Sequence, residues 1–114
     1  MAKVAKTITY EDNFNNFKTI LKQADASEID GELAFQFNIV GDGEGIFYAK
    51  VKDGQLSIEP FEYYDRDAVF IATEKVFTKM VEGKLNPVAA FTTGKLKVEG
   101  NLDKARAIQK IVKK

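Results

Sequence analysis

The chain contains no cysteine and no histidine. Without cysteine there can be no disulfide, no thiolate nucleophile and no cysteine-based metal site. Without histidine it lacks the commonest general base near neutral pH and the commonest metal ligand. Most familiar hydrolase and redox mechanisms are therefore excluded. Because nothing in the sequence pairs the remaining carboxylates and lysines, we expect a protein that is not an enzyme and that uses no metal and no cofactor.

Net charge and long apolar runs are also absent. The 17 basic and 17 acidic residues cancel, whereas a general nucleic-acid binder needs a basic excess to displace phosphate counterions. The longest apolar run, residues 68–72, is far too short to cross a bilayer. Residues 1–6 carry positive charge but no apolar segment follows them, so they make a poor secretory signal. We expect a cytoplasmic protein that does not bind nucleic acid.

The apolar residues that are present suffice for one packed domain spanning residues 1–114. They form 45% of the chain and include nine Phe. Where they recur at three- and four-residue steps they predict helices. A Thr or Asn that can cap the helix opens each of these segments: Thr9, Thr73, Asn86 and Asn101. The expected helices cover residues 10–24, 74–83, 87–94 and 102–114.

Elsewhere the apolar residues alternate with a period of two, which predicts strands. The alternation is clearest in residues 32–40, where polar Gln36 and Asn38 separate apolar neighbours and indicate a half-buried strand. Asp53-Gly54 is typical of a tight hairpin turn. Residues 67–72 are apolar on both faces, so this strand is central or has a covered second face. The expected strands cover residues 32–40, 46–52, 55–59, 67–72 and 95–99.

The resulting order is one helix, four strands, two helices, one strand and a final helix. Because short loops connect the first four strands, we expect a mainly antiparallel sheet with the helices gathered on one face. The Gly41-x-Gly43-x-Gly45 motif lies between two strands. A phosphate cradle needs the N–H groups of a helix N-terminus, so a hairpin turn is favoured here. The fold class is therefore α+β.

Charge is unevenly distributed along the chain. Residues 84–114 contain eight basic and two acidic side chains, a balance of +6, and the remainder carries −6. A basic C-terminal helix can favour transient contact with an anionic membrane surface or with coenzyme A phosphates. Lysines near a helix end also suit its dipole, and this simpler interpretation is the favoured one.

Two strings in the C-terminal half carry a family resemblance. They are Phe77-x-x-Met80-x-x-Gly83-Lys84-Leu85-Asn86-Pro87 and Ala90-Phe91-x-x-Gly94-Lys95-Leu96-Lys97-Val98-x-Gly100-Asn101. Together they resemble the signature of the sterol carrier protein type two family of lipid-binding domains, and similarity continues upstream to residue 45. Such a short chain suggests a free-standing bacterial or archaeal member. The chain does not end in Ser-Lys-Leu, so a peroxisomal location does not carry over.

The resemblance implies a five-stranded sheet and a non-catalytic carrier. Its apolar tunnel, between the sheet and the C-terminal helices, would take fatty acids, acyl-CoA, sterols or isoprenoid lipids. Gln109 falls where family members also carry Gln, and its amide can meet the polar head of a ligand. The candidate lipid-binding residues are Phe35, Phe37, Val69, Ile71, Phe77, Met80, Val81, Phe91, Ile108, Gln109, Ile111 and Val112.

A second hypothesis keeps the fold but fills the cavity. Such a protein would be an interaction or accessory module of a lipid or quinone pathway. Val69 and Ile71 lie where polar residues are expected, so their face is a candidate dimer surface or part of a more open pocket. We therefore expect a monomer or a weak homodimer.

Overall fold

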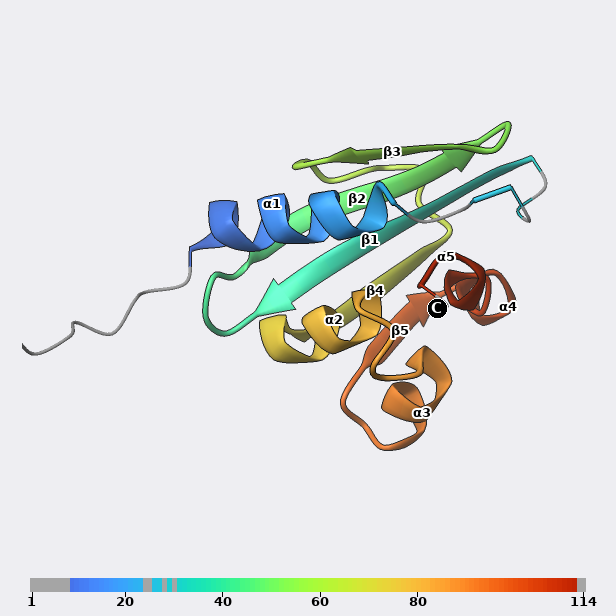
Figure 1. The fold of residues 1–114 in the computed structure, drawn as a ribbon. Helices are drawn as coiled ribbons and strands as arrows, with labels where there is room; N and C mark the ends of the chain where they lie inside the picture. Colours follow the sequence, from blue (N-terminus) through green and yellow to red (C-terminus); the bar gives the residue numbers. More distant parts are fainter. Residues whose placement is uncertain (1–8, 24–25, 28, 30, 113–114) are drawn as a thin grey trace, which may run out of the picture.

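The computed structural model describes residues 9–23, 26–27, 29 and 31–112, with the side chain of Val112 outside this description. Its helices and strands follow the predicted order, except that the final helix is divided into two short ones (Figure 1). In chain order the elements are α1 (Tyr10–Leu21), β1 (Glu32–Val40), β2 (Gly45–Lys52), β3 (Gln55–Glu59), β4 (Ala68–Thr73), α2 (Glu74–Val81), α3 (Pro87–Thr92), β5 (Lys97–Gly100), α4 (Leu102–Ala105) and α5 (Ile108–Val112).

The five strands form one sheet in the order β3-β2-β1-β4-β5. Every neighbouring pair is antiparallel except β1 and β4, which run parallel. The chain leaves β3 at one edge of the sheet and passes β2 and β1 before it enters β4, so residues 60–67 form a crossover connection. The architecture confirms an α+β fold whose sheet is mainly antiparallel.

Helices α1–α4 begin at the predicted caps. The Thr9 hydroxyl accepts a hydrogen bond from the Asp12 backbone N–H at 3.1 Å, and the Asp12 carboxylate accepts one from the Thr9 N–H at 3.3 Å. This reciprocal capping box satisfies two backbone donors at the start of α1. The other capping side chains also accept backbone hydrogen bonds; they are Thr73, Asn86 and Asn101.

A tight turn divides the predicted final helix into α4 and α5. It is closed by hydrogen bonds between residues three apart, such as that from the Ala107 N–H to the Lys104 carbonyl at 3.0 Å. Three residues per turn bring side chains at three-residue spacing onto one face. Ala105, Ile108 and Ile111 have this spacing and all three are buried. The turn therefore lets one short segment bury three apolar side chains.

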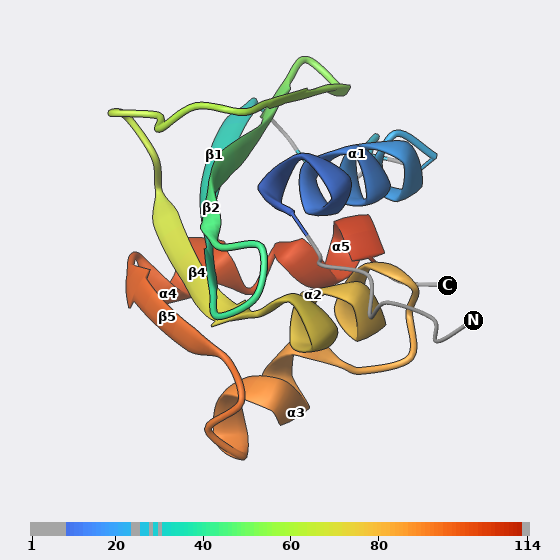
Figure 2. The ribbon, with the colours of Figure 1, turned by 90° about the vertical axis from the view of Figure 1, so that its left-hand side faces the viewer.

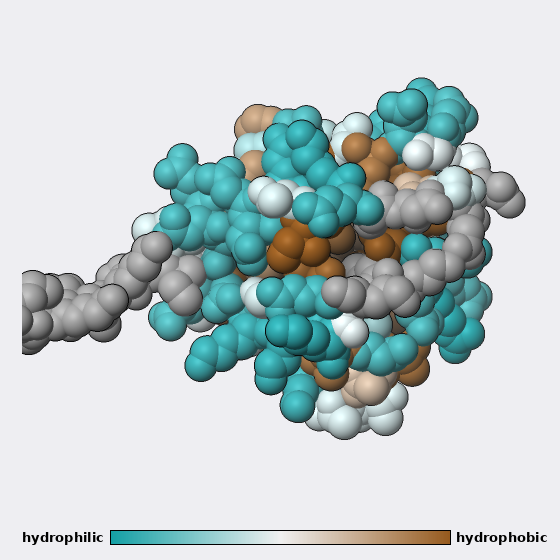
Figure 3. Space-filling model, in the orientation of Figure 1, coloured by the Kyte–Doolittle hydropathy of each residue, from teal (hydrophilic) through white to brown (hydrophobic). Residues whose placement is uncertain are grey.

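The helices lie on one face of the sheet, as Figure 2 shows for α1, α2 and α5. Between α1, α2 and this face, the rings of Phe17, Phe47 and Phe77 form part of the core, and all three are almost fully buried. Figure 3 shows that hydrophilic residues cover most of this side of the molecule. Apolar residues are visible between α1 and α2.

The opposite, outer face of the sheet differs from the half-buried strand expected for residues 32–40. Gln36 is only 2% exposed, and its amide nitrogen donates to the Asn38 side chain at 2.9 Å. The 60–67 connection runs on the side of the sheet away from α1 and α2 (Figure 2), and Tyr63 stacks on Tyr48 with ring centroids 4.8 Å apart. Strand β4 lies inside the sheet, between β1 and β5, and Val69 on its outer face is 8% exposed.

Candidate functional site

Half of the side chains predicted to line a tunnel instead pack against neighbouring core residues. The ring of Phe37 lies 4.7 Å from that of Phe47, 5.4 Å from Phe70 and 5.6 Å from Phe77, measured between centroids. Rings at these distances are in contact and leave no room for a ligand chain between them. The predicted lining residues that belong to this core and do not line the pocket described below are Phe35, Phe37, Phe77, Met80, Val81 and Ile111.

Two further predicted residues lie on the other side of the sheet. Successive side chains of a strand point to opposite faces, so Val69 and Ile71 lie opposite to Phe70, which packs in the core beneath the helices. They therefore do not share a space with the helical residues. The Val112 side chain lies outside the described part of the chain.

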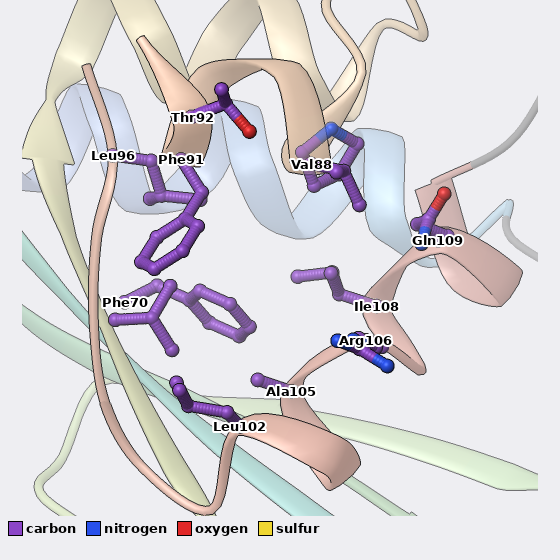
Figure 4. Close-up of a pocket in the computed structure, with 12 residues that line it drawn as sticks. Phe70, Val88, Phe91, Thr92, Leu96, Leu102, Ala105, Arg106, Ile108 and Gln109 are labelled. Atoms are coloured by element: carbon purple, nitrogen blue, oxygen red, sulfur yellow. The ribbon is translucent and has the colours of Figure 1, made fainter. Parts of the chain in front are cut away.

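A pocket of about 260 Å³ lies between β4, β5, α3 and the α4–α5 segment. Three predicted residues line it: Phe91, Ile108 and Gln109. Its other lining residues are Phe70, Pro87, Val88, Thr92, Leu96, Val98, Leu102, Ala105 and Arg106. Figure 4 shows Phe70, Phe91 and Leu96 grouped on one side of the pocket. Arg106 and Gln109 lie across from these three apolar side chains. The pocket therefore has an apolar, largely aromatic end and a polar end.

One wall of the pocket is α3 with the turn that follows it. The side-chain oxygen Oδ1 of Asn86 accepts hydrogen bonds from the N–H groups of Val88 (2.8 Å) and Ala89 (3.2 Å), and Pro87 occupies the first turn, where its missing N–H leaves no bond unmade. The Ala90 carbonyl accepts from the N–H groups of both Lys95 and Leu96, at 2.9 and 3.1 Å. These bonds fold Leu96 back against α3, where it faces the pocket beside Phe91.

The opposite wall is held by Asp67, at the entrance to β4. Its carboxylate accepts hydrogen bonds from the Ala34 N–H at 2.9 Å and from the Lys104 ammonium at 3.1 Å, and its carbonyl accepts from the Asn101 N–H at 2.9 Å. Gly100 has φ +93°, and a Cβ there would lie 2.8 Å from the Asp67 carbonyl oxygen. Glycine therefore permits the close approach that places Leu102 and Ala105 against β4.

Polar groups at the pocket are few. Within the described residues, Arg106 lines the pocket with no hydrogen bond or ion pair to its guanidinium. By contrast, the Lys104 ammonium nearby is paired with Asp67. Gln109 is partly exposed and Thr92 is exposed. An unpaired guanidinium and an amide beside an apolar space can bind the polar head of an amphiphilic ligand.

A second hollow lies on the outer face of the sheet, over β2 and β3, and has a different character. Charged and polar side chains make up most of its lining, which is Tyr48, Lys50, Lys52, Asp53, Gln55, Ser57, Glu59 and Phe61. Hydrogen bonds from Lys50 to Tyr63 and to Glu32 raise the pKa of Lys50. Since this ammonium already has partners and the lining is polar, the second hollow is a poor site for an apolar ligand.

No group of three or more acidic residues is placed to hold a metal ion in the described ranges. Over the same part of the chain, none of the helices combines the length and apolar character needed to span a bilayer.

Nine of the twelve pocket residues were not predicted as ligand contacts, although the sequence holds partial signals for them. Leu102 and Ala105 belong to the predicted apolar stripe of the final helix, and Phe70 lies on a strand predicted to be apolar on both faces. Val88 is on the predicted short helix. Periodicity predicts that such residues lie on a helix or strand. It does not predict where a helix and a strand are far enough apart to leave a pocket.

Two curated proteins are similar to most of this chain. Hydroxysteroid dehydrogenase-like protein 2 of Rattus norvegicus is 33% identical over 82 residues, which cover 71% of this chain and 16% of that protein. Sterol carrier protein 2 of Homo sapiens is 33% identical over 88 residues, which cover 74% of this chain and 16% of that protein. The chain therefore corresponds to only a small part of these relatives.

Solved structures share the fold over nearly the whole chain. Sterol carrier protein 2 from Yarrowia lipolytica has a TM-score of 0.57 and 25% identity, covering 88% of this chain and 73% of that one. UbiJ-SCP2, a ubiquinone synthesis protein, has a TM-score of 0.67 and 15% identity, covering 90% of this chain and 91% of that one. The profile of the SCP-2 sterol transfer family matches residues 14–113. The chain belongs to the SCP-2 sterol transfer family.

Proposed function

We propose that this domain is a non-catalytic carrier that binds a single-chain lipid in the pocket between β4, α3 and the α4–α5 segment. The observation that carries the proposal is the lining of this pocket, in which nine of twelve residues are apolar and the polar three are Thr92, Arg106 and Gln109. Binding sites for small molecules are commonly apolar spaces with a few convergent polar groups. Membership of the SCP-2 sterol transfer family supports the same interpretation.

The size of the pocket favours an acyl chain over a whole sterol. Its volume of about 260 Å³ lies slightly below the roughly 300–1,000 Å³ typical of pockets for drug-sized ligands. One water molecule occupies roughly 30 Å³, and a methylene group is of similar size. The pocket therefore holds about nine such groups. A medium-length fatty acid matches this number. A longer acyl chain, a sterol or an isoprenoid would need α3 and the α4–α5 segment to separate further from β4.

The arrangement of the lining orients the ligand. The apolar tail would lie against Phe70, Phe91 and Leu96, and the head would lie at the opposite end near Arg106 and Gln109 (Figure 4). A guanidinium offers a carboxylate two parallel hydrogen bonds. An acyl-CoA could place its carbonyl at the same position and leave its phosphates in solvent.

The expected affinity follows from these contacts. Burying about nine methylenes at ~0.8 kcal/mol each contributes roughly 7 kcal/mol. Lost translational and rotational freedom removes at least ~4 kcal/mol. Hydrogen bonds to the charged guanidinium add about 1.5–3 kcal/mol. The net of about 5 kcal/mol corresponds to a dissociation constant on the order of 0.1–1 mM.

A chain-length series tests the proposal. In a displacement titration with a fluorescent acyl-chain probe, the affinity of saturated fatty acids should rise with each methylene and level off near about ten carbons. Mass spectrometry under native conditions should detect the same acids bound in a one-to-one complex. Absence of saturable binding at millimolar ligand would contradict the proposal, whereas a continued rise to long chains would mean that the pocket widens.

The densely packed aromatic core favours a second candidate. Because the rings of Phe37, Phe47 and Phe77 fill the space beneath α1 and α2, an accessory module with a filled cavity would explain the fold without a ligand. The fold similarity to a ubiquinone synthesis protein agrees with a role beside a quinone pathway. Self-association through the face of Val69 and Ile71 has less support, since Val69 is only 8% exposed and Ile71 is only partly exposed. Light scattering separates the two candidate functions. The accessory module requires a stable complex with a second copy or with a partner protein, and the carrier does not.

A further inference from the structure

Exposed apolar side chains border one side of the pocket. Six large apolar residues are exposed within the part of the chain that is described, and three of them line this pocket: Val88 (46% exposed), Phe91 (47%) and Leu102 (51%). We call these three residues the α3–α4 rim. The remaining exposed ones, Val40, Phe61 and Tyr64, do not line it.

The local structure keeps the rim exposed. In α3 the side chains of Pro87 and Ala90 are buried and hold the helix in place, whereas Val88 and Phe91, each one position further along, border the pocket and stay about half exposed. In α4 the same division separates buried Ala105 from exposed Leu102. Both helices therefore present apolar groups to solvent as a consequence of how they are anchored. Exposed apolar groups clustered in this way often mark an interaction site.

The charges around the rim indicate the kind of surface that it meets. Arg106 lines the pocket without a partner among the described residues, and Lys95 is exposed in the turn that follows Phe91. Residues 84–112 carry six basic side chains against two acidic ones. They are Lys84, Lys95, Lys97, Lys104, Arg106 and Lys110, opposed by Glu99 and Asp103. Two copies of this region placed face to face would repel each other, whereas an anionic surface would attract it.

We propose that the α3–α4 rim inserts into the surface of an anionic lipid bilayer and brings the exposed side of the pocket against it. Three apolar anchors with basic neighbours suit the boundary between headgroups and acyl chains. They are too few for a stable protein interface, which buries on the order of 1,000 Å² or more. In this position a lipid would pass between the bilayer and the pocket without crossing water. Passage of a lipid between bilayer and pocket rests on the proposed carrier function. Binding of the rim to the bilayer does not depend on that function.

Single tryptophans test the proposal directly, because the chain contains none. Phe91→Trp places the reporter on the rim, and Phe61→Trp places it outside the rim on a residue that is also exposed, at 61% against 47% for Phe91. With vesicles of phosphatidylcholine and phosphatidylglycerol, we expect a blue shift for the first variant, no shift for the second, and loss of the shift in high salt. Equal behaviour of the two variants, or no shift at low salt, would overturn the proposal.

Co-sedimentation with the same vesicles gives a second measurement. Leu102→Ser should lower the partition coefficient of the protein about fivefold, and the matched control Phe61→Ser should leave it unchanged. If light scattering instead finds a dimer that Leu102→Ser dissociates, the rim meets a second copy and the membrane proposal is wrong. Binding of a soluble acyl probe without vesicles tests the pocket separately, so failure of the carrier function and failure of the membrane contact give different results.

Discussion

A substitution that fills part of the pocket tests whether the pocket binds a ligand. It should weaken ligand binding if the pocket is the binding site, and leave binding unchanged if it is not. Ala105 lies on α4, is 5% exposed, and faces the pocket in Figure 4. In Ala105→Leu, three additional carbon atoms enter the space, which is about a third of the roughly nine groups that it holds. A ligand then loses the burial of about three methylenes, about 2.4 kcal/mol, which corresponds to an affinity roughly 50-fold weaker.

The same substitution should not destabilise the fold. Because the added carbons occupy empty apolar space, the free energy of unfolding should stay the same or rise by up to about 2 kcal/mol. Loss of binding together with retained stability therefore cannot come from misfolding. Fatty-acid displacement titrations measure the affinity, and urea unfolding followed by circular dichroism measures the stability.

Ala89→Leu is the matched control for this experiment. Ala89 is exposed on α3 and does not line the pocket, so the same added carbons should leave binding within about twofold of the original value. The reasoning would be refuted if Ala105→Leu bound fatty acid as tightly as the unchanged protein, or if both variants weakened binding equally.

Three further predictions concern the head of the ligand and the fold. Arg106→Gln should weaken binding of a fatty acid about tenfold but leave binding of its methyl ester unchanged in the same titration, because only the carboxylate gains from the guanidinium. Gly100→Ala should lower the free energy of unfolding by about 2–3 kcal/mol in urea, against about 1 kcal/mol for Gly94→Ala, since a Cβ meets backbone atoms at the first position and open space at the second. Burial raises the pKa of Tyr10, so stability should fall above about pH 10 as the unfolded chain ionises first; in pH-dependent unfolding, Tyr10→Phe should show a smaller fall.

Local signals were sufficient to predict most of the fold. The caps Thr9, Thr73, Asn86 and Asn101 act at short range, through hydrogen bonds to residues two or three positions ahead. The Asp53-Gly54 turn likewise brings β2 and β3 together, and Asp53 has the positive φ that such a turn needs. Features of this kind depend only on neighbours in the chain, so they can be read from the sequence.

Long-range features of the fold were harder to predict. The parallel pairing of β1 with β4 depends on the path of residues 60–67 across the outer face, for which the sequence offers no periodic signal. On the same outer face, buried Gln36 is paired across the sheet with Tyr48 and Val69, and Tyr63 of this connection stacks on Tyr48. The division of the final helix into α4 and α5 was also not predicted; its tighter turn brings Ala105, Ile108 and Ile111, which are three residues apart, onto one buried face.

The pocket was predicted only in part, for a physical reason. Phe37 and Phe91 are both large apolar residues on elements that face the interior, yet one packs against other rings and the other borders a space. The difference is that the helix and strand beside Phe91 lie about one side chain further apart. The pattern of apolar residues along the chain does not reveal the distance between two elements. Val88 and Leu102 lie on predicted helices, but the apolar pattern does not show that they stay exposed and border the pocket.

The most direct test of the account is to locate a bound fatty acid on the protein. In an isotope-edited NOE experiment with unlabelled decanoic acid and labelled protein, we expect contacts from the methyl end to Phe70 and Leu96, and from the protons beside the carboxylate to Arg106 or Gln109. Contacts to Phe37 and Phe77 instead, or no intermolecular contacts at saturating ligand, would contradict it.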